Sequence, residues 1–196
     1  KSSFDVTAGY DYQYWKSTTP LYSEMNTLGE IQKTSKASDE RHVLLSYYGR
    51  LNYSFNSRYM LTTTVRRDAT SRFAKNVRWG TFPSVALGWR VTEESFLKDN
   101  KVISTLKVRA SYGVTGQQDG IGNYNYLPIY TISQSGAGSL IGGTPTPTYR
   151  PKAYVPNLKW ETTTSWNVGF DFGFLKDRIT GSFDYYTRQT KDLIAT

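Results

Sequence analysis

Amide, carboxylate and phenol side chains are concentrated in one segment of the chain, residues 116–157. Several lie within ten residues of one another: Gln117, Gln118, Asp119, Asn123, Tyr124 and Tyr126. Aromatic rings combined with amides suit stacking on sugars or peptides and hydrogen bonding to them. We therefore expect these residues to contribute to a substrate-binding surface. The alternative is that the rings pack on each other or on a partner.

The sequence offers little support for a nucleotide-binding, metal-binding or catalytic site. The glycine-rich residues 116–122 lack the Lys-Ser/Thr pair of a P-loop and the strand–turn–helix setting of a dinucleotide site. The chain has one His and no Cys, which excludes disulfides, Cys-ligated metals and multi-His metal clusters. A lone residue such as His42 is more often a hydrogen-bonding group than a catalytic base. We therefore expect no enzyme activity, no catalytic residue, no metal site and no cofactor.

The elements that position these side chains are strands, because apolar and polar residues alternate along most of the chain. In residues 160–174 the even positions hold Trp, Thr, Val or Phe, and the odd positions hold Glu, Thr, Ser, Asn, Gly or Asp. The same alternation recurs in residues 4–14, 43–55, 59–68, 84–91, 106–114 and 178–188. No comparable segment has a period of 3.6. The sequence therefore predicts an all-β fold with about seven strands.

Alternation alone does not distinguish a soluble β-sandwich from a transmembrane β-barrel, because both have one apolar and one polar face. Strand length favours the barrel: several segments run for about 13 to 15 residues, against about 5–6 in most globular proteins. The connections also favour it. Short turns at 56–57 and 175–177 alternate with long connections at 16–41, 69–80 and 116–157, as expected for periplasmic turns and extracellular loops.

The distribution of charge agrees with this interpretation. The chain carries a net charge of +8, yet the polar faces of the predicted strands are nearly balanced, so the excess lies in loops, turns and strand ends. The densest basic stretch is opposed only by Asp68 and includes Arg67, Arg72 and Arg78. We expect these three arginines to contact lipopolysaccharide phosphates, with a solvated loop as the alternative. No motif for binding nucleic acid accompanies the charge.

Several blocks of sequence resemble the SusC/RagA class of TonB-dependent outer-membrane transporters. They are residues 46–53, 58–61, 66–73, 82–90, 111–116 and 158–163. The resemblance implies an antiparallel up-and-down barrel of 22 strands, closed by an N-terminal plug and located in the outer membrane of a Gram-negative cell. It also implies import of large nutrients such as oligosaccharides or peptides, energy delivered by TonB, and a SusD-type surface lipoprotein as partner.

The chain departs from that class in its extent. It contains no plug domain and no segment for contact with TonB, and about seven strands is an odd number for a single-chain bacterial barrel. We therefore expect residues 1–196 to be part of the transmembrane barrel domain, a wall segment whose plug lies elsewhere. A further hairpin around residues 124–132 would raise the count to nine. The competing functional hypothesis is a soluble β-sandwich that binds carbohydrate through its loop tyrosines.

Overall fold

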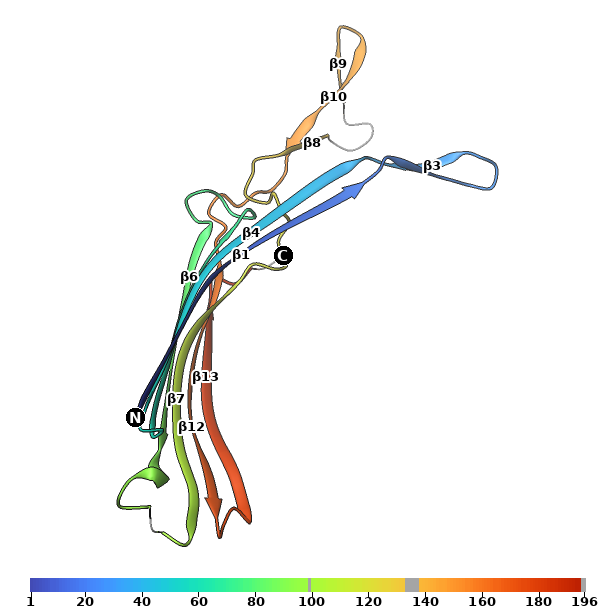
Figure 1. Cartoon of the computed structure of the whole chain (residues 1–196). Coiled ribbons are helices and arrows are strands. Elements are labelled where there is room, and N and C mark those ends of the chain that lie inside the picture. The colour runs from blue at the N-terminus through green and yellow to red at the C-terminus, as the bar shows by residue number, and fades with distance from the viewer. Residues whose placement is uncertain (99, 133–137, 195–196) are drawn as a thin grey trace.

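The computed structural model describes residues 1–98, 100–132 and 138–194. Its main element is one curved antiparallel sheet (Figure 1). In spatial order the strands are β1 (Ser2–Thr19), β4 (Ser38–Phe55), β5 (Tyr59–Thr70), β6 (Trp79–Arg90), β7 (Ile103–Gln117), β12 (Glu161–Phe174) and β13 (Ile179–Lys191). The prediction of an all-β, up-and-down sheet of seven strands is confirmed. No helix among the described residues has the length and hydropathy to cross a membrane.

The short connections lie together at one end of the sheet, at the bottom of Figure 1. Asn56 and Ser57, which join β4 to β5, both have positive φ angles, the backbone of a type I′ hairpin turn. A single turn of 3₁₀ helix, η1 (Val91–Glu93), begins the connection from β6 to β7. The other end of the sheet carries the connections from β1 to β4, from β5 to β6 and from β7 to β12, which include the two longest.

Those long connections contain more strand than the sequence analysis predicts. β1 and β4 stay paired as far as Thr19 and Ser38, well inside the predicted loop at 16–41, and a small hairpin of β2 (Tyr22–Met25) and β3 (Ile31–Ser35) continues them. Beyond β7 there are two more small pairs, β8 (Tyr130–Ile132) with β11 (Tyr149–Pro151) and β9 (Gly138–Ile141) with β10 (Thr144–Pro147). The suggested hairpin at 124–132 is wrong, because β8 pairs with the distant β11 and neither joins the main sheet.

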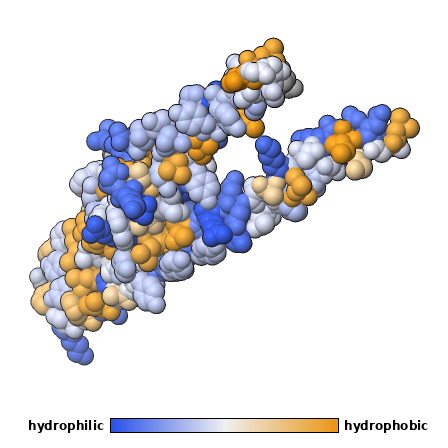
Figure 2. All heavy atoms as spheres, turned by 90° about the horizontal axis from the view of Figure 1, so that it is seen from above, coloured by the Kyte–Doolittle hydropathy of each residue, from blue (hydrophilic) through white to orange (hydrophobic). Residues whose placement is uncertain are grey.

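The main sheet is a single layer with two chemically different faces. On one face, the outer face, cross-strand rows are apolar: Leu61 lies opposite Leu87, which lies opposite Ala110. Side chains of this face are widely exposed, and apolar residues cover broad areas of the surface seen from above (Figure 2). No second sheet covers this face among the described residues, so the β-sandwich alternative is wrong.

The opposite face, the inner face, carries a polar network that crosses strands. Arg66 on β5 bonds Asp68 and reaches Ser46 on β4. Arg109 on β7 bonds Asp171 on β12 at 2.9 Å and Asp184 on β13 at 3.1 Å.

Gly169 on β12 makes the longer reach of Arg109 possible. This residue lies between Arg109 and Asp184 in one cross-strand row. A Cβ at Gly169 would come within 2.4 Å of the Asp184 carboxylate, closer than real Cβ contacts allow. The missing side chain therefore leaves the path across β12 open.

A small aromatic core holds the long connections against the end of the sheet. Phe73, Phe82 and Ile121 surround Trp160, and all four are buried. Both Phe rings meet Trp160 edge-on, at centroid distances of 5.5 and 5.2 Å, the favourable arrangement for aromatic pairs. The indole N–H of Trp160 donates to the Arg78 carbonyl at 3.0 Å. This cluster fixes the segments 71–78 and 117–123 beside β4.

Candidate functional site: a polar pocket above an apolar wall

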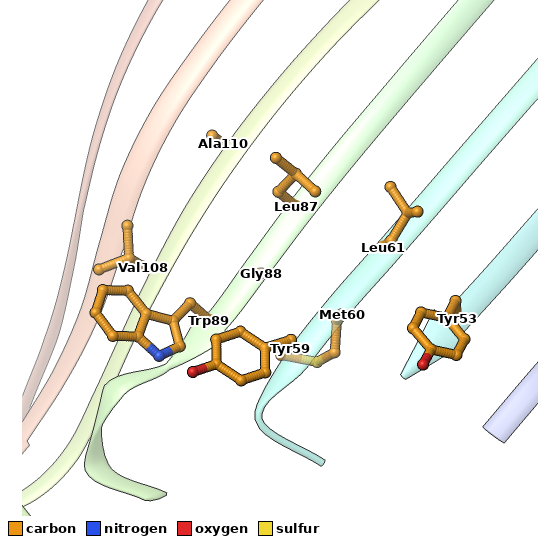
Figure 3. Close-up of a pocket in the computed structure, with 9 residues that line it drawn as sticks. All are labelled: Tyr53, Tyr59, Met60, Leu61, Leu87, Gly88, Trp89, Val108 and Ala110. Atoms are coloured by element: carbon orange, nitrogen blue, oxygen red, sulfur yellow. The ribbon is translucent and has the colours of Figure 1, made fainter. Parts of the chain in front are cut away.

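The outer face carries an apolar depression of about 330 Å³ (Figure 3). Leu61, Leu87, Val108 and Ala110 line it, and Tyr59 and Trp89 stack on each other at one end. The walls are almost entirely hydrocarbon and ring surface. Such a surface suits lipid chains and offers little to a polar substrate.

Aromatic rings bound the apolar band on this face. On β4, Phe55 lies at the turn end and Tyr47 lies eight residues away; on β12, Phe174 and Trp166 have the same spacing. Eight residues of strand span about 27 Å, or about 20 Å of height at a barrel tilt of about 40°. Transmembrane barrels have an apolar band about 25 Å tall between two girdles of rings, so the spacing fits a membrane-spanning wall.

Near the end of the sheet that carries the extracellular-type connections, the inner face of the β1–β4 ribbon forms one wall of a polar pocket of about 590 Å³. The opposite wall comes from Arg72 and from residues of segment 118–123, beside the aromatic core. The lining combines one large ring with amides, acids and bases: Gln13, Trp15, Lys16, Ser17, Glu40, His42, Leu44, Arg72, Gln118, Asp119 and Asn123. Its volume lies within the range of ordinary ligand sites, about 300–1,000 Å³.

A chain of hydrogen bonds joins the polar lining of the pocket. Asn123 donates its amide N–H to Glu40 at 3.1 Å and accepts an N–H from Arg72 at 3.2 Å. Arg72 also donates to the Gln118 carbonyl and to Asp119 at 3.3 Å. Arg72 therefore connects two segments of the loop wall, and Asn123 connects that wall to β4.

His42 forms part of the pocket floor. Its ring stacks on Trp15 with centroids 4.6 Å apart, and its Nε2 lies 3.1 Å from the Thr70 hydroxyl. Burial, followed by the positive charge of Arg72, lowers the pKa of His42 below its usual range. The charged groups of the lining are Lys16 and Arg72 against Glu40 and Asp119.

Comparisons with known proteins identify the family. Residues 2–196 match the family model described as the TonB dependent receptor-like β-barrel. The chain belongs to this family. It is 54% identical to the TonB-dependent receptor SusC of Bacteroides thetaiotaomicron, with 98% of the chain and 20% of that protein aligned. It is 33% identical to the TonB-dependent receptor P39 of Formosa agariphila, with 95% of the chain and 18% of that protein aligned.

The fold comparison agrees. The sheet superposes on the structure of the RagAB peptide transporter with a TM-score of 0.79 and 24% identity, covering 98% of the chain and 22% of that chain. The open-open state of the RagAB peptide importer gives a TM-score of 0.75 at 26% identity, covering 95% and 21%. The chain thus spans about a fifth of the length of these relatives.

The barrel segment brings together some of the residues that the sequence analysis selects. Gln118, Asp119 and Asn123 line the polar pocket. Tyr124 lies beside it, where its hydroxyl accepts the backbone N–H of Arg41 at 3.2 Å. Gln117 is the last residue of β7 and is exposed, and Tyr126 is half-buried; neither lines the pocket.

The three arginines predicted to contact lipopolysaccharide lie in different environments. Arg67 is exposed on the outer face, with its guanidinium 5.0 Å from the centre of the Trp79 ring. Arg72 points into the polar pocket instead. Arg78 is half-buried beside the aromatic core, and its Nε atom has no hydrogen-bond partner among the described residues. Of the three arginines, Arg67 alone is exposed on the outer face.

Sequence reasoning missed the residues that β1 and β4 contribute to the pocket. Trp15 breaks the alternation of its strand, since it is a large ring at a position of polar parity next to Tyr14. That irregularity is the one local signal for the site. Gln13 and Glu40 give no such signal, because polar residues are ordinary on an inner face. No group of three or more His, Cys, Asp or Glu side chains suited to a metal occurs among the described residues.

Proposed function

We propose that this chain is a wall segment of a TonB-dependent outer-membrane transporter that imports large nutrients such as oligosaccharides or peptides. The observation that carries the proposal is the two-faced, single-layer sheet, with an apolar outer face bounded by rings and a charge-paired inner face. A wall of this kind separates lipid from a water-filled lumen. Membership of the TonB-dependent receptor family supports active uptake as the purpose of that lumen.

The wall acts with parts outside this chain. β1 and β13 are the edges of the sheet, and lipid cannot satisfy the backbone groups of an open edge. The barrel therefore needs further strands, which we expect to bring the total to 22. The resemblance to the SusC/RagA class supports an N-terminal plug that contacts TonB and a SusD-type lipoprotein over the extracellular loops. The role of this segment is then passive: it lines the path and presents loops, while catalysis plays no part.

Outer-leaflet lipid is a further expected partner in the outer membrane of a Gram-negative cell. Arg67 lies over Trp79, which in turn stacks near Tyr47 at a centroid distance of 6.2 Å. A cation held at the level of the upper rings is well placed for a lipopolysaccharide phosphate, because a long side chain reaches the interface while its stem stays on apolar surface. We expect Arg67→Gln to reduce the lipopolysaccharide that co-purifies with the full-length protein. Unchanged retention would overturn this contact.

The transport proposal is tested with the full-length protein in cells. We expect a strain that produces it to take up labelled oligosaccharides or peptides, and to lose that uptake when either the transporter or TonB is deleted. Restoring the transporter from a plasmid should restore uptake, which controls for effects on neighbouring genes. If the uptake of every such compound persists after the transporter is deleted, the proposal is refuted.

A further inference from the structure

The polar pocket has an exposed aromatic platform. Trp15 lies on the inner face of β1, in cross-strand register with His42 on β4. His42 is 6% exposed and covers one face of the indole, whereas Trp15 itself remains 45% exposed. The ring is therefore supported from behind and accessible from the pocket. An indole fixed in this way offers a flat, electron-rich face at little cost in conformational entropy.

Hydrogen-bonding groups surround that platform on the facing wall. Asp119 is 73% exposed at its side chain although it accepts from Arg72, so its carboxylate keeps free acceptor capacity. Glu40 is exposed and accepts only one hydrogen bond, from Asn123, among the interactions of the described residues. Each carboxylate presents two oxygen atoms in one plane, a spacing that suits a pair of neighbouring hydroxyl groups.

The charge of the lining favours a neutral ligand. Two cations and two carboxylates balance. Neither a strongly acidic nor a strongly basic ligand would gain a net attraction here. We propose that this pocket is a saccharide subsite, in which one pyranose ring stacks on Trp15 and its hydroxyl groups bond to Asp119 and Glu40. The proposal rests on the transport function above and names the substrate class of that function.

The chemistry of a sugar fits the site better than that of a peptide. The C–H groups of a pyranose face carry partial positive charge and match the negative face of an indole. An extended peptide instead needs a free strand edge for main-chain hydrogen bonds. At this level β1 and β4 pair with each other, and on the other edge of β4 the N–H groups of Arg41 and Val43 already donate to Tyr124 and Ser71. The outer edge of β1 is the one that a further strand covers in the closed barrel proposed above.

The test uses the full-length transporter with any lipoprotein that co-purifies. Calorimetry measures binding of maltohexaose, cellohexaose, mannohexaose and the peptide (Gly-Ala)₃ to the wild type and to variants. For the saccharide that binds, we expect Trp15→Ala to weaken affinity about tenfold and Trp15→Phe, which keeps a ring, to weaken it less than about threefold. Asp119→Ala, a change at an exposed side chain, should weaken it about threefold. Trp166→Ala, which removes a somewhat more exposed indole from the outer face, should leave the affinity unchanged.

Heat-modifiable mobility on gels checks that each variant forms a folded barrel. The saccharide subsite is refuted if none of the three saccharides binds, if Trp15→Ala and Trp166→Ala have equal effects, or if only the peptide binds. Uptake assays separate this failure from failure of transport. TonB-dependent uptake of the peptide with no saccharide binding would overturn the subsite and leave the transport function intact, whereas loss of all TonB-dependent uptake would overturn both.

Discussion

Exchanging a lipid-facing residue and its lumen-facing neighbour for arginine tests the assignment of the two faces of the sheet. Val85 lies on the outer face of β6, between the rings of Trp79 and Trp89. Ala86, the next residue, faces inward between Thr62 and Ser111. Val85→Arg and Ala86→Arg therefore introduce the same side chain at nearly the same height, but on opposite faces.

The expected difference follows from the environment of each face. Arginine at the middle of the lipid band of a β-barrel costs about 2–4 kcal/mol, which is about 30- to 700-fold in the folding equilibrium. The neighbours of Ala86 are hydroxyl groups beside a water-filled lumen, where a polar substitution typically changes stability by about 0.5 kcal/mol. The outer-face variant should thus be destabilised by at least about 1.5 kcal/mol more than the inner-face variant.

The measurement is reversible guanidinium unfolding of the full-length protein in lipid vesicles, followed by tryptophan fluorescence and by gel mobility. Wild type and both variants are compared at the same lipid composition. Equal destabilisation of the two variants would refute the assignment of faces, and a larger effect at Ala86 would reverse it. Either result would also remove the main support for the membrane-wall proposal.

Three further changes test separate parts of the structure. Gly169→Ala forces a Cβ against Asp184 and the path of Arg109, so we expect a loss of about 1–3 kcal/mol; an unchanged thermal midpoint contradicts this. Phe73→Ala leaves a cavity in the aromatic core at a fully buried position and should lower the local stability by about 3–5 kcal/mol. The variant should then be cleaved faster by protease within residues 117–132. Equal cleavage rates in the wild type and the variant would disprove the role of the cluster. Hydrogen bonds from Tyr59 and Trp89 lower the pKa of the Glu94 carboxyl below its usual 4.5. The stability that these hydrogen bonds provide is therefore complete above about pH 4.5, and it is lost as the pH falls through the lowered pKa. Glu94→Gln should therefore flatten the acid side of the stability profile, and a profile that keeps its wild-type slope would show that Glu94 is not responsible.

The sheet could be predicted because its signal is local. Every second residue of a strand faces the same way, so residues 160–174 reveal two faces without knowledge of any partner strand. The alternation of short and long connections then gave the topology. The extension of β1 and β4 to Thr19 and Ser38 could not be found in this way, because both strands become polar on both faces once they leave the lipid band, and the periodic signal ends there although the pairing continues.

The pocket was only half predictable for a related reason. Gln118, Asp119 and Asn123 stand out as a cluster of polar residues in one loop, whereas Glu40 lies about 80 residues earlier and Trp15 more than 100 residues earlier. The register of β1 with β4 and the aromatic core together bring the two sets into contact. Similar reasoning explains Arg72: its place in a basic stretch suggested a lipid phosphate, but three hydrogen bonds to segment 118–123 turn it inward.

The position of the proposed saccharide subsite at the upper end of the sheet predicts how it would act in uptake. Trp15 and His42 lie one residue beyond Tyr14 and Val43, the last apolar positions on the outer face of β1 and β4. The pocket therefore lies at the upper margin of the apolar face, and the Phe73–Trp160 cluster that supports it belongs entirely to this wall. We therefore expect a ligand to bind here before any change deeper in the lumen. Substitution of Trp15 should then lower the affinity for the saccharide and leave the dependence of uptake on TonB unchanged.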